Sequence, residues 1–153
     1  MNHWRQKKKK PENTFKVMQL DPRAKLPTRG TADSAGLDLY AIEEMAIPPE
    51  AIVSARTGLA MEIPKGHFGQ LCTRSSMGKS GVRIAAGVNI IDADYRGEVL
   101  VFLRNDGIYE WHVHQGDRIA QIVICRDEGF SPVLSESLSE TARGAGGYGS
   151  TGR

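Results

Sequence analysis

Short apolar segments recur along most of the chain, and each is closed by Gly, Pro, Asn or Asp. Turn-forming sequences such as Pro64-Lys65-Gly66 and Asn105-Asp106-Gly107 stand between them. Short strands at this spacing, rich in Val, Ile, Tyr and Phe, are typical of a β-sandwich or barrel. The expected strands cover residues 15–20, 37–42, 51–55, 59–63, 67–73, 82–85, 99–103 and 118–125. The pattern therefore predicts an all-β protein, in which only residues 75–80 offer a short helical turn.

The two ends of the chain differ from the middle in composition. Residues 1–14 are polar and basic, and their run of four lysines (7–10) leaves three interpretations open: a nuclear address, a cloning remnant or a solvated tail. Residues 139–153 (SETARGAGGYGSTGR) contain five glycines and little apolar surface, which is typical of a flexible arm. We therefore expect a disordered lead over residues 1–14, a β-domain over 15–138 and a Gly-rich arm over 139–153.

Composition indicates a single globular domain. The chain has 153 residues, of which 40% are hydrophobic and 25% charged, so it needs no disulfides to fold. The net charge is +2 including the four lysines, so the rest of the chain carries −2, which argues against stable nucleic-acid binding. No apolar run is long enough to span a membrane, and the N-terminus has no apolar signal region. Cys72 and Cys125 lie in apolar runs and are predicted to be buried thiols in a reducing intracellular compartment, cytoplasmic or nuclear.

Two phosphate-binding motifs are present only in part. Gly78-Lys79-Ser80 matches the end of a P-loop, but Thr73 stands where that motif requires its first glycine. Residues 144–149 (GAGGYG) match the dinucleotide fingerprint, but no helix follows them in the sequence. Both interpretations are therefore rejected, although Gly-rich backbone still offers bare N–H donors that can surround an anion.

Several polar side chains interrupt apolar segments. Asp92 follows two isoleucines, and is either a turn aspartate or a functional carboxylate. Arg74, with Ser75 and Ser76 after it, suits a phosphate or marks an ordinary turn at the end of a strand. Gln121 lies inside an apolar run, so its amide either bridges the structure or contacts a ligand. His112 and His114 alternate on one strand without a third ligand nearby, which indicates a surface pair rather than a metal site.

Five segments share one order along the chain: AGLDLYA (35–41), RSSMGKSGV (74–82), IIDADYRGEV (90–99), GDRIAQIVI (116–124) and RGAGGYGSTG (143–152). From about Lys16 to Gly152 they resemble the five ordered motifs of the dUTP pyrophosphatase (dUTPase) family. The resemblance implies a jelly-roll-like β-fold in a homotrimer. Each site would take the first, second and fourth motifs from one subunit, the third from another, and the C-terminal arm from another. The implied reaction is Mg²⁺-assisted hydrolysis of dUTP to dUMP and pyrophosphate, which limits uracil incorporation into DNA and supplies dUMP for dTTP synthesis.

The resemblance also implies residue roles. Asp92 becomes the base that orients the attacking water at the α-phosphorus, Tyr95 lies under the deoxyribose, and Asp38 holds waters of the magnesium ion. The groups serving the phosphates are Arg74, Ser75, Ser76 and Gln121. The hairpin 86–92 reads the uracil edge, through Ala86, Gly87, Asn89, Ile90 and Ile91. The arm closes on the triphosphate with Arg143, Gly147, Gly149, Ser150 and Thr151, while Tyr148 stacks on uracil.

Some positions depart from the family pattern, and two rival readings stand beside it. Thr73 replaces the usual proline, and Tyr148 replaces the more frequent Phe. Asn89 replaces a usual glycine, and Asn tolerates a left-handed backbone better than most residues. A dCTP deaminase, a relative of similar fold, carries a catalytic glutamate where this chain has Phe102, and lacks the aromatic arm. A non-catalytic nucleotide-binding module is the alternative of another class, disfavoured by retention of Asp92, Tyr95 and the arm.

Overall fold

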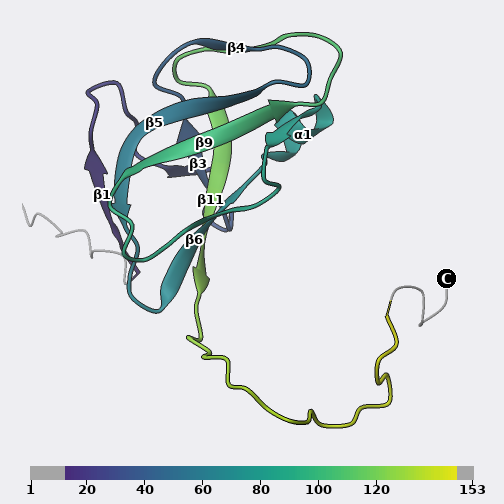
Figure 1. Cartoon of the computed structure of the whole chain (residues 1–153). Coiled ribbons are helices and arrows are strands. Elements are labelled where there is room, and N and C mark those ends of the chain that lie inside the picture. The colour runs from purple at the N-terminus through teal and green to yellow at the C-terminus, as the bar shows by residue number, and fades with distance from the viewer. Residues whose placement is uncertain (1–12, 148–153) are drawn as a thin grey trace, which may run out of the picture.

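Antiparallel β-strands make up nearly all of the regular structure in the computed structural model, which describes residues 13–147 (Figure 1). One sheet has the order β1 (Lys16–Gln19), β5 (Ile52–Glu62), β9 (Glu98–Asn105) and β7 (Val82–Ile84). The second has the order β2 (Thr28–Arg29), β3 (Leu37–Tyr40), β11 (Arg118–Arg126), β6 (His67–Cys72) and β8 (Asn89–Ile91). A small sheet pairs β4 (Met45–Ile47) with β10 (Trp111–Val113), and the one helix in residues 13–147 is α1 (Ser75–Lys79). Most neighbouring strands in the two large sheets are not consecutive in the sequence, so the chain crosses between the sheets. This topology confirms the predicted jelly-roll-like β-fold.

The core lies between the two large sheets, which Figure 1 shows crossing with β5 and β9 in one layer and β6 and β11 in the other. Alternate residues of each strand point inward, as the pleat requires. On β9, Val99, Val101 and Leu103 are buried, whereas Leu100 and Phe102 face outward. They meet buried side chains of the other sheet, among them Leu39, Leu71 and Ile122. Packing of two such inner faces is what a β-sandwich uses to exclude water.

The predicted strands at 51–55 and 59–63 are one continuous strand in the structure, so their separation was wrong. β5 runs from Ile52 to Glu62, with a register shift against β9 between Arg56 and Ala60. Gly58 has φ +67° at this bulge, and a Cβ there would lie 2.9 Å from the Ala24 Cβ. The glycine that looks like a strand end therefore lets a single strand bend without ending.

The two cysteines are free, but neither is buried as predicted. Cys72 and Cys125 occupy outward positions of β6 and β11, where they are half-buried, and the buried neighbours on β6 are Gly69 and Leu71. In the β6–β11 register Cys72 lies opposite Gln121, and Cys125 lies opposite Phe68. The prediction failed because an apolar run in a strand places only alternate residues in the core.

The chain leaves the β-domain after β11. Residues 127–147 contain no strand, and Figure 1 shows this segment running away from the body in yellow-green. The last strand ends at Arg126, and the boundary at residue 138 stays a prediction. Most of the predicted N-terminal lead lies outside the described residues. Within residues 13–147, no helix is long and apolar enough to cross a membrane.

Candidate functional site

A polar pocket of about 320 Å³ lies where β3, β11 and the start of α1 meet. It brings together five side chains that the sequence predicted from three separate segments: Asp38, Arg74, Ser75, Ser76 and Gln121. The complete lining also includes Gly30, Ser34, Gly36 and Arg118. We call this hollow the cationic pocket, because two of its lining side chains are arginines and only one is a carboxylate.

Asp38 is the electrostatic centre of the cationic pocket and is only 8% exposed. Arg74 donates from Nε to Asp38 Oδ1 at 2.7 Å, and Arg118 donates from Nη1 to Asp38 Oδ2 at 3.3 Å. Arg74 also donates from Nη1 to the Ser76 hydroxyl at 3.3 Å. Two guanidinium groups around one carboxylate leave a net positive charge beside hydroxyl groups, which suits a polyanion such as a phosphate chain.

Gln121 makes a structural contact, which confirms the bridging interpretation, and it also lines the cationic pocket, where contact with a ligand stays a prediction. Its Nε2 donates to the carbonyl oxygen of Thr73 at 3.3 Å. Thr73, the departure from the family's proline, accepts a hydrogen bond from the Ile84 N–H at Oγ1 with a length of 2.9 Å. The threonine therefore ties the start of α1 to β7, a connection that proline could not make through its side chain.

A second hollow of about 300 Å³ contains the predicted third-motif residues. Its lining is Asn89, Ile90, Ile91, Asp92, Tyr95, Glu98, Leu100 and Phe102, and we call it the aromatic pocket. Asp92 directly follows β8 and is exposed, so its carboxylate is not buried among the apolar side chains that precede it. No hydrogen bond joins this carboxylate to another of residues 13–147, although its backbone oxygen accepts from the Tyr95 N–H at 3.2 Å.

Tyr95 is held by contacts at the hydroxyl end of its side chain. Its hydroxyl donates to the carbonyl oxygen of Glu98 at 3.0 Å. Its ring lies directly against Gly97, where any Cβ would overlap the ring atoms. Tyr95 is 42% exposed and lines the aromatic pocket, so part of its side chain is accessible to a ligand there.

Residues 86–92 do not form a hairpin of their own, which corrects the prediction. β7 pairs with β9 in one sheet, and β8 pairs with β6 in the other, so residues 85–88 turn between the two layers. Gly87 carries the positive φ of +77°, and neither Ala86 nor Gly87 lines the aromatic pocket. Asn89 lies in β8 opposite Leu71 without a left-handed backbone, so the missing glycine has no steric consequence there.

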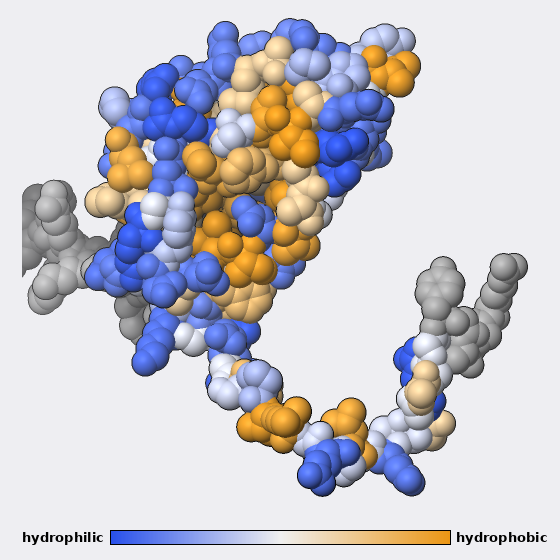
Figure 2. All heavy atoms as spheres, in the orientation of Figure 1, coloured by the Kyte–Doolittle hydropathy of each residue, from blue (hydrophilic) through white to orange (hydrophobic). Residues whose placement is uncertain are grey.

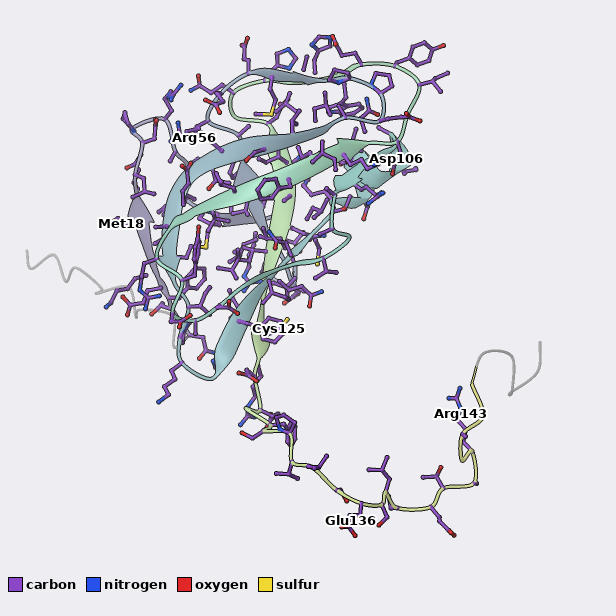
Figure 3. All side chains as sticks on the ribbon, viewed as in Figure 1. Met18, Arg56, Asp106, Cys125, Glu136 and Arg143 are labelled. Carbon is purple, nitrogen blue, oxygen red and sulfur yellow. The ribbon has the colours of Figure 1, made fainter. Side chains whose placement is uncertain are left out.

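Of the predicted arm residues, the two that the structure describes, Arg143 and Gly147, line neither pocket in a single chain. Figure 3 shows Arg143 far along the segment that leaves the body, and Arg143 Nε donates only to the Gly146 carbonyl, at 2.8 Å. Gly147 follows on the same segment, while Tyr148, Gly149, Ser150 and Thr151 lie outside the described residues. His112 and His114 are exposed and contact Glu110 and Asp117 at 3.2 and 3.5 Å, which confirms the surface pair. In the described part of the chain, no three His, Cys, Asp or Glu residues form a metal cluster.

A cationic pocket and an aromatic pocket on a jelly-roll-like β-fold define a protein suited to an anionic ligand with a planar ring, such as a nucleotide. A family model described as dUTPase matches residues 22–152, which include all five motifs. The chain belongs to the dUTPase family, and is thus an enzyme of the class that hydrolyses dUTP. This assignment rejects the dCTP deaminase alternative.

Individual relatives agree with that assignment. The probable deoxyuridine 5'-triphosphate nucleotidohydrolase of Schizosaccharomyces pombe is 43% identical over 139 residues, covering 91% of this chain and 99% of its own length. The mitochondrial counterpart of Dictyostelium discoideum is 40% identical over 139 residues, covering 91% of this chain and 77% of its own, so relatedness leaves the compartment open. The Staphylococcus bacteriophage 80alpha dUTPase with dUPNHPP superimposes with a TM-score of 0.86 at 26% identity, over 92% of this chain and 99% of that one. The phage phi11 dUTPase, described with a structural Mg(II) ion, has a TM-score of 0.78 at 23% identity, over 84% of this chain and all of that one (100%).

Proposed function

We propose that this chain converts dUTP and water to dUMP and pyrophosphate, with Asp92 as the base and with active sites shared between subunits of a homotrimer. The observation that carries the proposal is the division of the site in one chain. The cationic pocket and the aromatic pocket have no lining residue in common, and Arg143 lies apart from both. A nucleoside triphosphate needs all three parts at once, which copies of the chain can supply to one another.

Asp92 is suited to accept a proton. Its carboxylate is exposed and makes no hydrogen bond within residues 13–147, so both oxygens are available to a water molecule. As the water oxygen bonds to the α-phosphorus, its proton passes to Asp92, and the bond from the α-phosphorus to the bridging oxygen breaks. Pyrophosphate leaves with the electron pair. Arg74, Ser75, Ser76 and Gln121 hold the phosphates while this charge moves.

The cationic pocket also has a group suited to magnesium. Mg²⁺ prefers oxygen ligands and keeps several of its waters, so it needs only one or two carboxylates beside the substrate phosphates. Asp38 is the only carboxylate that lines this pocket, among hydroxyl groups and arginines. It would hold waters of an ion bound to the triphosphate, where that ion neutralises phosphate charge. The structural Mg(II) ion described for the phage phi11 relative indicates that a protein of this fold can bind magnesium.

Base selection has a basis in the position of β8. This strand ends the five-stranded sheet, so the backbone groups on its outer side have no strand partner in the described structure. Fixed backbone donors and acceptors can match the hydrogen-bonding edge of uracil. With cytosine in the same place, some of these backbone groups would be buried without a partner, and this cost disfavours the wrong base. The ring of Tyr95 in the same pocket would lie under the sugar and leave no room for a 2′-hydroxyl group.

Exposed apolar surface supports the homotrimer. On the segment after β11, Phe130, Val133, Leu134 and Leu138 are 85–104% exposed. Val88, Ile90 and Phe102 are also exposed on the body. Figure 2 shows apolar surface across the middle of this face and again along the extended segment. Apolar area of this extent is stabilised when other copies cover it, as in a closed symmetric oligomer.

The direct test is product analysis with dUTP, dCTP, dTTP and UTP, together with an Asp92→Asn variant. We expect dUTP to be strongly preferred. Asp92→Asn should bind nucleotide but lose turnover by about 10²–10⁴-fold or more, because the amide keeps the shape and loses the basicity. Asp94→Asn is the matched control, since Asp94 is exposed nearby but does not line the aromatic pocket. Comparable turnover of UTP or dCTP contradicts the proposal, and release of intact dUTP favours the non-catalytic module.

A further inference from the structure

Glu98 lies in the third motif, but the resemblance assigns it no role. Its side chain ties the aromatic pocket to the neighbouring strand β5. Its carboxylate accepts from Arg56 Nε at 3.2 and 3.1 Å, and from the Gly58 N–H at 2.8 Å. Arg56 Nη2 also lies 3.1 Å from Glu98 Oε2. The Glu98 side chain is 19% exposed, so these contacts are partly shielded from water. We call these three residues, Arg56, Gly58 and Glu98, the β5–β9 clasp. Figure 3 labels Arg56, which lies on β5.

The clasp lies at the bulge of β5, where the sheet needs an extra contact. Between Arg56 and Ala60 the ladder with β9 shifts register, so backbone groups there lack their regular strand partners. The Gly58 N–H donates to the Glu98 carboxylate instead of to backbone, and the Gly58 carbonyl accepts from the Leu20 N–H at 2.8 Å. The position of Glu98 along β9 is therefore set by its side chain as well as by the ladder.

Glu98 also contacts Tyr95 through its backbone. The Tyr95 hydroxyl donates to the Glu98 carbonyl at 3.0 Å, and the Tyr95 ring lies against Gly97 immediately before it. Both contacts depend on where the chain turns into β9. Because the carboxylate of Glu98 anchors that point to β5, a shift of Glu98 moves the far end of the Tyr95 side chain.

We propose that the β5–β9 clasp positions the Tyr95 ring and thereby determines how strongly the enzyme rejects ribonucleotides. The inference rests on the proposed function, in which Tyr95 excludes the 2′-hydroxyl group. An apolar surface by itself rejects an added hydroxyl group only weakly. Stronger rejection requires that the ring cannot move aside to make room for the hydroxyl group. A displacement of about 1 Å can change a rate by about 100-fold, so a fixed ring discriminates where a loose one does not. Arg56 and Glu98 are positioning residues: Glu98 also lines the aromatic pocket, but its carboxylate is engaged by Arg56 and the Gly58 N–H and acts on the nucleotide through Tyr95.

The test compares kcat/KM for dUTP with kcat/KM for UTP. Glu98→Ala removes every side-chain contact of the clasp, and we expect the dUTP/UTP ratio to fall by about 10-fold, chiefly because UTP is used better. Glu98→Gln keeps an oxygen for the Gly58 N–H, so the ratio should change by less than about 3-fold. Glu62→Ala is the matched control: it removes an exposed β5 ion pair with Lys16 of 3.1 Å outside both pockets and should leave the ratio unchanged.

A double-mutant cycle separates positioning from simple destabilisation. Tyr95→Phe removes the hydroxyl bond to Glu98 and keeps the ring, so it should lower the ratio by a mechanism shared with Glu98→Ala. The double variant should then resemble the worse single variant, whereas multiplied effects would show that the two residues act independently and overturn the proposal. Calorimetric binding of dUMP and UMP should show the same loss of discrimination without turnover. If Glu98→Ala does not fold, Arg56→Gln and Tyr95→Phe complete the cycle.

Failure of the clasp is distinguishable from failure of the proposed function. A wild-type protein without dUTP turnover refutes the function. A wild-type protein that prefers dUTP to UTP, with a folded Glu98→Ala variant of unchanged ratio, refutes the clasp and leaves the function intact.

Discussion

At the residue scale, the cationic pocket depends on charges that meet only in the folded chain. Asp38 is nearly buried, and each of its oxygens accepts from a different arginine. A carboxylate in this position would be costly if it were unpaired. Paired with Arg74 and Arg118, it leaves one positive charge in excess, so the pocket holds its shape while empty and still attracts a polyanion.

Gly36 leaves the room that Gln121 occupies, and this gives a first prediction. A Cβ at position 36 would lie 3.0 Å from Gln121 Cδ and would overlap its Oε1. Gly36→Ala should therefore push the amide out of the cationic pocket and raise the KM for dUTP by about 10-fold, while the core is unaffected. Steady-state kinetics and thermal denaturation measure the two effects. Gly78→Ala is the control, since its nearest contact is 3.7 Å away, and an equal KM change there would contradict the steric explanation.

The sequence predicted part of the candidate site and missed Arg118 and Glu98. Arg74, Ser75 and Ser76 are adjacent, so one short segment reveals them. Arg118 reaches Asp38 only because β11 pairs with β3, which joins positions 80 residues apart. Glu98 gains its contacts only through the bulge in β5. Local pattern contains no information on such pairings, whereas it does show which residue types a site requires.

At the element scale, Asp106 joins β7 to β9 just beyond the end of the ladder. Arg83 and Arg104 lie opposite each other in these strands, and like charges in that position repel. Asp106 accepts from Arg104 Nε at 2.6 Å and from Arg83 Nε. Hydrogen bonds from Arg104, and then from Arg83, hold the pKa of the Asp106 carboxyl below its ordinary value.

This lowered pKa predicts a pH-dependent stability. A carboxyl whose pKa is lower in the folded state stabilises fully above its unfolded pKa, near about 4, and loses that effect as pH falls through the folded value. Asp106→Asn should therefore lower Tm at pH 7, and the difference from wild type should shrink as the pH falls below about 4. Thermal denaturation from pH 7 to pH 2 measures this. Asp94→Asn is the control, since it removes an exposed carboxylate that has no ion pair within residues 13–147. A constant Asp106→Asn deficit at all pH values would contradict the mechanism.

The larger strands were predictable because alternation and length mark them, as for β9 and β11. The strands β2, β4, β8 and β10 have only two or three residues, so they carry no recognisable period. They exist because neighbouring strands pair with them. The same tertiary cause explains why residues 86–92 divide between two sheets rather than closing as a hairpin.

At the scale of the whole molecule, the segment after β11 combines two parts of different character. Phe130, Val133, Leu134 and Leu138 are apolar and exposed, whereas the Gly-rich residues beyond them offer little to a core. Deleting residues 140–153 should therefore leave a folded, thermally stable trimer with little activity. Analytical ultracentrifugation, thermal denaturation and dUTP turnover measure the three properties. Loss of the trimer on deletion would mean that the Gly-rich arm is structural.

Shared sites predict that two inactive variants restore activity to each other. Asp92→Asn removes the base, and Arg143→Ala removes the cation of the arm, so each alone should be nearly inactive. Unfolded together in equal amounts and refolded, they should assemble into random trimers. A site then works only if its residue 92 comes from the Arg143→Ala chain and its residue 143 from the Asp92→Asn chain.

Each of these conditions holds with a probability of about one half, so roughly a quarter of the sites in a closed trimer should be active. The mixture should therefore reach about a quarter of wild-type activity. If both residues acted from one chain, every chain would lack one of them, and no mixing could restore a complete site. Mixed trimers confirmed by native mass spectrometry, with activity no higher than that of the separate variants, would refute shared sites. Activity near a quarter would require that Asp92 and Arg143 reach each site from different subunits.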